Sequence, residues 1–495
     1  MIFKNLKTLS QKTLFFYFSF FFLFLDIVIA LLFNIPFIKP VFWILVGLTF
    51  LTNGIFILLY GEDDINNKFI DIGKKIIKIG AGIFVFLIVL TIITSPLFFS
   101  KDYVNIIKVK EINSTDFIVN NPKQIRKVTR QMALIKVNKI LGLKINGTEI
   151  STQFEITKGN IIKYHGKEYW IFPLTYSSVF SWFNNNNIPG YILVSATNPD
   201  AKAVFIKKSY KISTGYLWDN IKRVAYFKTL FAPFDYHFEI DEKGNPYWIV
   251  IKEYYKFYGH LLLPNEIYLI NAKTGKTIHK NIKNAPKWVD KLIPEEIAKD
   301  LIEYNGKYKN GFFNAVFTQR NVVIPTQYQG KELWLIENTK NPDLMWFTGL
   351  TSPNKKDNSL ISSIALDAKS LTAYKFTDMF GITDEKGAID SIDSALGANA
   401  IKWKAVLPMP LIINKNFYWV ASIVNKDTNI YQKEGAVKGD DITKTVIANN
   451  LEEIIFKLKE NTNNKQIHTK NKRELILEKI NKIEKELKEL KKLVK

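Results

Sequence analysis

The residues best able to do chemistry lie within one short segment, Asp235-Tyr-His237-Phe-Glu239-Ile-Asp241. The alternation of a β-strand places Asp235, His237, Glu239 and Asp241 on one face and the apolar side chains on the other. A histidine flanked by carboxylates can bind a divalent cation or transfer a proton. Side chains two positions apart on a strand are roughly 7 Å apart, so a second strand would have to complete a metal site. The alternative is the polar face of a half-buried antiparallel strand.

The other histidines add nothing to this set. His165, His260, His279 and His468 are isolated, without metal-ligand spacing or a hydrolase motif nearby. The absence of cysteine excludes disulfides, thiolate metal sites and a cysteine nucleophile. The sequence also lacks a phosphate loop, a dinucleotide fingerprint and a paired-carboxylate signature. It therefore predicts no catalytic residue and no cofactor, and an enzyme is the minority hypothesis.

The first hundred residues contain three hydrophobic runs, at about 13–33, 41–60 and 80–99. Each is about 20 residues long, which is enough to cross roughly 30 Å of hydrocarbon as a helix. The sequence therefore predicts a transmembrane region over 1–100 with three spans. Asp26 lies in the middle of the first span, where an ionisable group is a functional candidate by default. A helix–helix contact is the alternative, and the absence of a basic partner in the other spans favours it.

Lysines flank these runs unevenly. Three lysines precede the first run and four lie between the second and third, whereas the link 34–40 contains only Lys39. Basic residues concentrate on the cytoplasmic side of membrane proteins. The sequence thus predicts a multi-pass protein of the cell membrane with a cytoplasmic N-terminus and a large extracytoplasmic domain.

Residues 130–440 read as a module used about four times. The shared element is a turn followed by a strand that carries a tryptophan, as in Gly166-Lys-Glu-Tyr-Trp-Ile. The four tryptophans are Trp170, Trp248, Trp334 and Trp419. They could form a binding platform, but repetition at matched strand positions favours one core anchor per module. Helical patterns precede the strands at Thr129–Leu141, Leu217–Leu230, Pro294–Tyr304 and Gly387–Ile401. The fold class is therefore a membrane α-helical segment followed by an α+β domain of repeated helix and antiparallel-sheet modules.

A second strand closes three of the modules with a turn, best seen in Asn271-Ala-Lys-Thr-Gly275. A helix, a strand ending near Gly-x-x-Tyr-Trp-x-Val and a strand ending in Asn/Asp-Ala-x-Thr-Gly together resemble the PepSY-type domain family. The third copy departs from this pattern, with Leu371 and Thr372 in place of Thr-Gly, and the fourth has no clear equivalent. The resemblance implies an extracytoplasmic, membrane-attached protein that modulates peptidases or the cell envelope. It implies no shared catalytic residues.

The net charge and the C-terminal pattern indicate which partners the chain could bind. The net charge of +22 would attract anionic lipid, anionic polymer or nucleic acid, but a coding bias toward A and T is the favoured explanation, because the lysines are scattered and form no compact basic block. Gly439-Asp-Asp441 reads as a turn and N-cap for a helix over Thr443–Leu458. Apolar residues then recur at spacings of four and three from Ile476 to Val494, which predicts a short coiled coil and a homo-oligomer. A single helix docked on the domain or on an anionic surface is the alternative.

These observations divide the chain into five parts. After the transmembrane region, modules 1 and 2 occupy 101–285, modules 3 and 4 occupy 286–445, a helix and polar linker occupy 446–470, and the coiled-coil helix occupies 471–495. The sequence predicts a non-catalytic, membrane-anchored envelope protein whose modules bind or scaffold another macromolecule. The alternatives are a regulator of a peptidase or an uncharacterised enzyme, and a binder of anionic polymer or nucleic acid.

Overall fold

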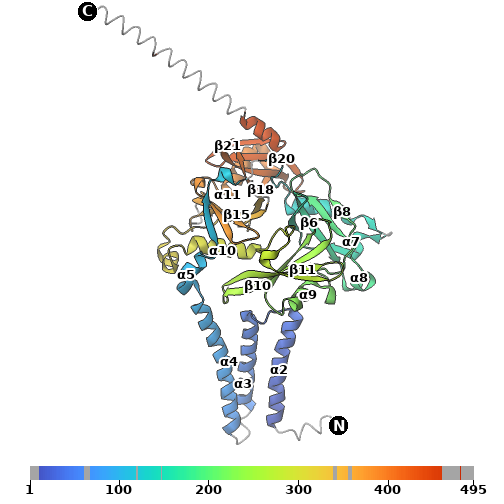
Figure 1. Ribbon diagram of the computed structural model, residues 1–495, viewed down its shortest axis with the longest axis vertical. Coiled ribbons are helices and arrows are strands. Elements are labelled where there is room, and N and C mark those ends of the chain that lie inside the picture. The colour runs from blue at the N-terminus through green and yellow to red at the C-terminus, as the bar shows by residue number, and fades with distance from the viewer. Residues whose placement is uncertain are drawn as a thin grey trace, which may run out of the picture.

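The computed structural model describes residues 11–60, 67–118, 121–145, 148–337, 343–354 and 359–459, together with residue 480. Long apolar helices extend from one side of a mixed domain of helices and antiparallel sheets (Figure 1). The predicted coiled coil, and the polar linker beyond residue 459, lie outside the described residues.

Three helices run side by side below the domain: α2 (Gln11–Phe33), α3 (Pro40–Tyr60) and α4 (Asn67–Ile93). Two of them contain stretches long and apolar enough to cross a membrane, Pro40–Leu58 and Ile70–Ile93. In α2 the described apolar stretch is shorter, Phe24–Phe33. These helices are compatible with a membrane protein.

Helix α4 does not coincide with the hydrophobic run at about 80–99. It begins at Asn67, so the four lysines between the second and third runs belong to its first turns, and it ends at Ile93. Pro96 cannot donate the backbone hydrogen bond that would continue the helix, and it instead opens a new helix, α5 (Pro96–Val104). The position of Pro96, and not the end of the hydrophobic run, therefore sets where helix α4 ends.

Helices α3 and α4 approach each other through glycines. A Cβ added at Gly80 would lie 2.9 Å from the Gly47 carbonyl oxygen and 3.0 Å from the Leu51 backbone nitrogen. A Cβ at Gly54 would lie 2.9 Å from the Ile77 backbone nitrogen. Small residues are typical of close helix pairs in membranes because they let the backbones touch.

Substitution of Gly80 by valine is expected to lower the free energy of unfolding by about 1–3 kcal/mol, because the backbone of α3 would have to move. Gly82 is the matched control, since nothing lies within 4 Å of a Cβ added there. Thermal or denaturant unfolding of the purified full chain in detergent would compare the two variants. Equal stability of Gly80→Val and Gly82→Val would contradict the close α3–α4 contact.

The domain contains four large sheets, each with its own helix. The first sheet follows α6 (Arg130–Leu141) and has the order β4-β6-β7-β8, with β5 also paired to β6. Its strands are β4 (Phe154–Ile156), β5 (Asn160–Tyr164), β6 (Lys167–Tyr176), β7 (Tyr191–Ser195) and β8 (Val204–Ile206). Two short helices, α7 (Ile150–Gln153) and α8 (Val179–Asn184), and a small β2–β3 ribbon (Lys144–Ile145 and Thr148–Glu149) complete this unit.

The second sheet follows η2 (Leu217–Asp219) and α9 (Ile221–Lys228) and is an antiparallel meander. Its strands are β9 (Phe234–Ile240), β10 (Pro246–Phe257), β11 (Leu261–Asn271) and β12 (Thr277–Asn281). The fourth sheet has the same order of strands after α11 (Glu385–Ala395) and η6 (Gly397–Ile401). Its strands are β18 (Trp403–Ile413), β19 (Asn416–Asn425), β20 (Tyr431–Lys438) and β21 (Asp441–Ala448).

The third sheet lies between the second and the fourth in the sequence. It follows α10 (Glu295–Lys307) and η4 (Asn314–Thr318). Its strands are β13 (Ile324–Pro325), β14 (Trp334–Glu337), β15 (Leu344–Thr351), β16 (Ser362–Asp367) and β17 (Thr372–Phe376). The segment that leaves the apolar helices forms β1 (Lys108–Ile112) and pairs in parallel with β17. The start of the domain thus joins the third sheet and not the first, so the 101–285 part is not self-contained.

Each sheet carries a tryptophan whose indole nitrogen donates to a backbone carbonyl just before a helix or its leading turn, at 2.8–3.0 Å. The four pairs are Trp170 with Val128, Trp248 with Ile212, Trp346 with Ile293, and Trp419 with Thr383. In the third sheet the donor is Trp346 of β15, whereas the sequence pattern singles out Trp334 of β14, which is also buried.

The segments that precede these helices also form backbone hydrogen bonds to a second point of each sheet. Two consecutive backbone N–H groups donate to the carbonyl of a single buried alanine in the first three units, and one donates to a glycine in the fourth. The acceptors are Ala196, Ala272, Ala368 and Gly439. The three alanines belong to the turns that the sequence comparison between modules picks out.

The predicted helices at Thr129–Leu141, Leu217–Leu230, Pro294–Tyr304 and Gly387–Ile401 are confirmed as helical segments, within a few residues at their ends. The helix predicted over Thr443–Leu458 was wrong in its first half. Residues of β21 are mostly β-branched and pair with β20, so that helix begins only at residue 451. Its N-cap is Asn450, whose side chain accepts from the Glu453 backbone nitrogen at 2.9 Å.

The domain is fixed to the ends of the apolar helices at two places. Tyr226 of α9 donates its hydroxyl to the Ile35 carbonyl in the link between α2 and α3, at 2.8 Å. The tip of the β10–β11 hairpin meets the end of α4, where His260 Nε2 lies 2.8 Å from the Thr91 carbonyl and Thr94 donates to the Tyr258 carbonyl at 3.0 Å. The α2–α3 link and the C-terminal end of α4 therefore lie on the domain side.

Candidate functional site

The structure brings together two of the four residues singled out by the sequence. His237 Nε2 and Glu239 Oε1 share a hydrogen bond of 2.8 Å on one face of β9. Asp241 turns away, because its carboxylate accepts from the backbone and side-chain nitrogens of Asn245 at 2.7 and 2.8 Å, closing the β9–β10 turn. Asp235 lies at the other end of the strand, half-buried.

In the part of the chain that the structure describes, no group of three or more histidine, aspartate or glutamate side chains is arranged to hold a metal ion. The second ligand-bearing strand that such a site would need is absent from the neighbourhood of His237 among these residues. The opposite strand, β10, places Ile249 beside His237 and Tyr247 beside Glu239. The metal hypothesis thus gains no support from the arrangement.

Glu239 is instead enclosed by the segment that leads into α10. It is 1% exposed, and its Oε2 accepts from the Asp290 backbone nitrogen at 3.0 Å. The Asp290 carboxylate accepts from the Lys163 backbone nitrogen of β5. Lys291 donates its Nζ to the Ile161 carbonyl at 3.1 Å. Through Asp290 and Lys291, the segment before α10 thus joins β5 of the first sheet to Glu239 on β9 of the second.

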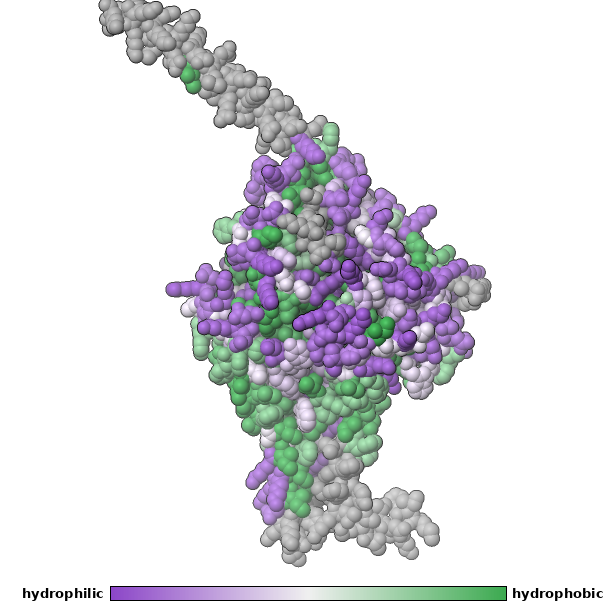
Figure 2. Space-filling model, viewed as in Figure 1, coloured by the Kyte–Doolittle hydropathy of each residue, from purple (hydrophilic) through white to green (hydrophobic). Residues whose placement is uncertain are grey.

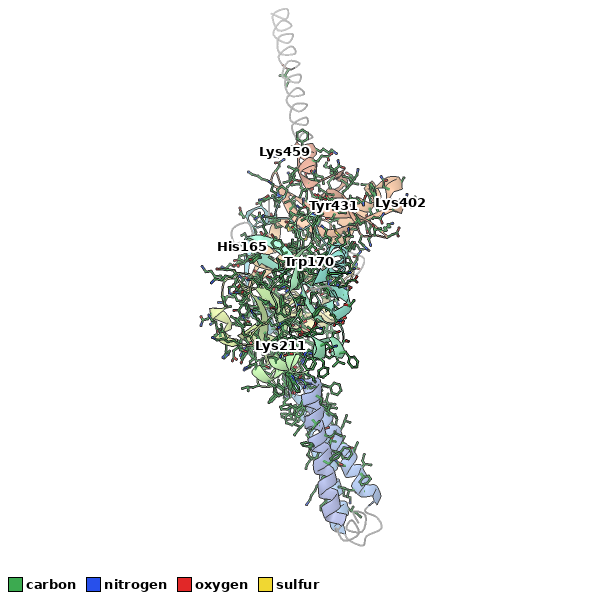
Figure 3. The ribbon with its side chains drawn as sticks, turned by 90° about the vertical axis from the view of Figure 1, so that its right-hand side faces the viewer. His165, Trp170, Lys211, Lys402, Tyr431 and Lys459 are labelled. Atoms are coloured by element: carbon green, nitrogen blue, oxygen red, sulfur yellow. The ribbon has the colours of Figure 1, made fainter. Side chains whose placement is uncertain are left out.

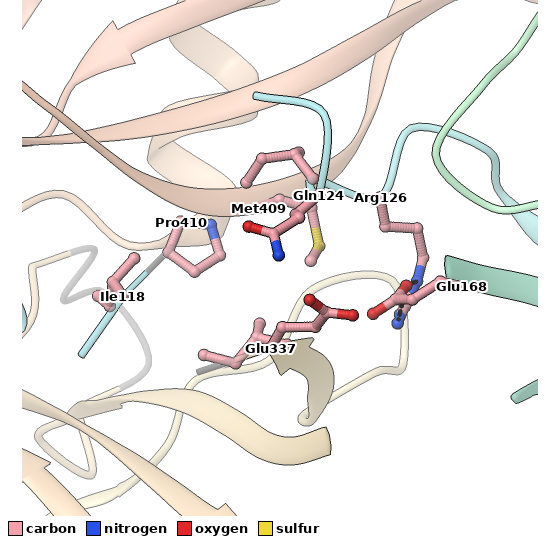
Figure 4. A pocket seen from close by; sticks show the side chains of 9 residues that line it. Ile118, Gln124, Arg126, Glu168, Glu337, Met409 and Pro410 are labelled. Atoms are coloured by element: carbon pink, nitrogen blue, oxygen red, sulfur yellow. Dashed lines mark hydrogen bonds and ion pairs between the residues drawn. The ribbon is translucent and has the colours of Figure 1, made fainter. Parts of the chain in front are cut away.

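The polar contacts continue from β5 into the third sheet. Lys163 Nζ lies 3.0 Å from Glu337 Oε1 of β14. Arg126, just before α6, holds Glu168 of β6 with its Nε at 2.9 Å and an Nη at 2.8 Å from the same carboxylate oxygen. Glu337 and Glu168 face each other (Figure 4). The resulting buried charge cluster consists of Arg126, Lys163, Glu168, His237, Glu239, Asp290, Lys291 and Glu337.

A small cavity opens at the arginine end of the buried charge cluster (Figure 4). Arg126, Glu168 and Glu337 line it on one side, and Met409 and Pro410 of β18 on another. It encloses about 10 Å³, which is room for roughly one water molecule and for no larger ligand.

Burial is the largest cause of the pKa shifts of Glu239, Asp290, His237 and Glu337. It raises the pKa of Glu239 to about 7, against the opposing charge of Lys291, and it raises the pKa of Asp290 well above its ordinary value. It lowers the pKa of His237 to about 3, so this histidine is neutral at physiological pH. Burial also raises the pKa of Glu337, and the facing Glu168 raises it further.

Chemically, the cluster can hold a proton near neutral pH, but it offers that proton little access to a substrate. Its carboxyl groups are nearly closed to solvent and already bonded to lysine, arginine or backbone groups. What the geometry does achieve is to connect three sheets through paired charges. Its most direct role is to fix the units of the domain relative to one another.

Sequence reasoning missed six members of the cluster, Arg126, Lys163, Glu168, Asp290, Lys291 and Glu337. One signal was available for Arg126. Only five of the 68 basic residues are arginines. In a chain so rich in lysine, an arginine marks a place where the planar guanidinium matters, as it does opposite a buried carboxylate.

No protein-family model matches the chain, and no curated protein matches it.

Proposed function

We propose that this protein is a non-catalytic membrane-anchored scaffold of the cell envelope. In this proposal α2, α3 and α4 all span the bilayer, the N-terminus is cytoplasmic, and the domain lies outside. Two arguments support it: the lysine distribution, and the position of the α2–α3 link and the end of α4 on the domain side, away from the C-terminal end of α3 and the N-terminal end of α4.

The observation that carries the proposal is the fixed attachment of the domain. Phe257, at the tip of the β10–β11 hairpin, stacks on Tyr103 of α5 with ring centroids 4.0 Å apart. Gly259 at this tip has a φ of +75°, a conformation that favours glycine. Together with the hydrogen bonds of His260 and Tyr226, these contacts hold the domain at one height and angle. A domain held in this way presents a fixed surface to a partner.

We propose further that the domain consists of four repeated modules related to the PepSY type. The support is the shared pair of contacts in each unit, one from a tryptophan indole and one to an alanine or glycine carbonyl, both at the segment leading into the helix. Neighbouring units share cores, since one apolar cluster joins the first and second sheets and another joins the third and fourth. The PepSY resemblance stays a prediction, as does homo-oligomerisation through the C-terminal heptads.

The sidedness is tested with a cleavable tag after Lys495 in intact cells. Removal of the tag by external protease is expected, and a tag placed before Met1 serves as the control that should stay protected. Protection of the C-terminal tag until lysis would reverse the topology. The partners would then be cytoplasmic, and the envelope clause of the proposal would be wrong.

A second candidate function, binding of an anionic polymer or nucleic acid, is favoured by the placement of charge. Ten carboxyl side chains but only three basic side chains are buried in the part of the chain that the structure describes. The outer surface is therefore more positive than the net charge of +22 alone suggests. Binding of a polyanion such as RNA that weakens steeply with salt would support this candidate, and salt-independent binding would contradict it.

A further inference from the structure

Large apolar side chains are exposed on the side of the domain that meets the apolar helices. We define the aromatic rim as Phe180, Phe183, Trp218, Leu230, Phe313 and Phe317, which are between 65% and 76% exposed. In Figure 2 hydrophobic surface gathers at this lower side and continues onto the helices, whereas hydrophilic surface covers most of the domain above it. Such a concentration of exposed apolar surface marks an interaction site.

One arm of the aromatic rim is built outward from the α2–α3 link. Phe231, which follows α9, packs on Phe37 of the link with ring centroids 5.0 Å apart. Asp219 of η2, just before α9, accepts from the Trp182 indole of α8 at 2.8 Å. The contact holds α8, with its exposed Phe180 and Phe183, against η2, which carries the exposed Trp218 and leads into α9.

The other arm starts at the end of α4 and follows a chain of aromatic rings. Tyr103 meets Tyr304 at 4.9 Å, and Tyr304 stacks on Tyr308 at 5.9 Å between centroids. Tyr308 stacks in turn on Phe312 at 6.2 Å, and the exposed Phe313, just before η4, and Phe317 of η4 follow. The two arms leave the apolar helices at α9 and at α5, which lie on opposite sides of these helices (Figure 1).

The chemistry of the rim fits a lipid surface. Aromatic rings are favoured at the boundary between hydrocarbon and water, where one part of the ring is apolar and another is polar. Lys222 and Lys228 of α9 are exposed beside the rim, and this helix carries no acidic residue. Lysines at this depth attract anionic headgroups.

We propose that the aromatic rim inserts into the leaflet on the domain side, so that the domain is seated in the headgroup layer and not held above it. This inference rests on the proposed membrane anchoring. It adds a lipid-binding face to the scaffold and leaves the opposite end of the domain free for a partner.

The absence of cysteine allows a direct test with single cysteines. Phe180→Cys and Phe317→Cys in the full chain would carry a fluorophore, in vesicles of phosphatidylcholine and phosphatidylglycerol containing a nitroxide-labelled lipid. Ile401→Cys is the matched control, because Ile401 is 80% exposed and lies next to Lys402, at the end of the domain away from the helices (Figure 3). Phe86→Cys, exposed on α4, reports on the anchoring itself.

Several-fold stronger quenching of the labels at 180 and 317 than at 401 is expected. Strong quenching at 86 with none at 180 and 317 would overturn the seating of the domain and leave the anchoring intact. Absence of quenching at 86 as well would overturn the membrane anchoring on which the inference rests.

Discussion

Replacement of Arg126 by methionine is expected to lower the free energy of unfolding by about 3–5 kcal/mol. The side chains of Arg126 and Glu168 are 5% and 3% exposed, so removal of the guanidinium leaves a buried carboxylate without its counter-charge. Glu337 faces the same carboxylate, and two like charges would then share one small space. Denaturant unfolding of the full chain in detergent, followed by tryptophan fluorescence, measures the effect.

The double variant Arg126→Met with Glu168→Gln separates a charge effect from lost packing. It should recover most of the loss, because neither side chain is then charged. The solvent-accessible pair Lys457–Glu453 provides the surface control, and Lys457→Met should change the free energy of unfolding far less than Arg126→Met. A loss below about 1 kcal/mol for Arg126→Met would contradict the structural importance of the cluster.

Lys127, the residue after Arg126, connects the segment before α6 to a further sheet. Lys127 Nζ lies 3.1 Å from Glu434 of β20, and its backbone carbonyl accepts from Ser422 of β19 at 2.7 Å. Two consecutive basic residues therefore connect the segment before α6 to both the first and the fourth sheets. Together with Lys163 and Lys291, they add polar contacts between the sheets to the apolar clusters that the sheets share.

Local patterns in the sequence predicted local structure well. The alternation from Asp235 to Asp241 predicted strand β9, and Pro294 with the two glutamates after it predicted the start of α10. The indole of Trp419 is buried as a core anchor. These features depend on residues only a few positions apart, which is the range over which periodicity and capping operate.

The candidate site could not be predicted in the same way, because its contacts join distant residues. Glu239 meets Asp290 from 51 positions away, and Lys163 meets the Asp290 carboxylate from 127 positions away. Alternation in β9 correctly placed His237 and Glu239 on one face, although Asp241 lies beyond the end of the strand, and it could not show that the polar face is also covered. The segment before α10 covers it, and nothing near His237 in the sequence indicates that.

The unfolding free energy is expected to fall as the pH rises from about 4.5 to about 8 because of Glu253. This residue of β10 is 7% exposed, and burial raises the pKa of its carboxyl group from the ordinary value of 4.5 to about 8, with a further contribution from Asp235. The folded state favours the protonated carboxyl group of Glu253. The contribution of this group to the free energy of unfolding is therefore fully present below the ordinary pKa of 4.5, and it is lost as the pH rises through the folded pKa of about 8. Glu253→Gln should therefore stabilise the protein above pH 8 by roughly 2–5 kcal/mol and change little at acidic pH.

Glu266, on the adjacent strand β11, gives a control of opposite sign. Hydrogen bonds from Lys252, Tyr268 and His279 lower the pKa of this more exposed carboxyl group, although its partial burial opposes them. The contribution of Glu266 to the free energy of unfolding is present above the ordinary pKa and is lost as the pH falls. Glu266→Gln should therefore destabilise the protein at neutral pH and not in acid. Unfolding curves of both variants across this pH range distinguish the two cases. A Glu253→Gln protein that follows the parent at every pH would mean that Glu253 ionises freely, and hence that water reaches β10 beside the apolar helices.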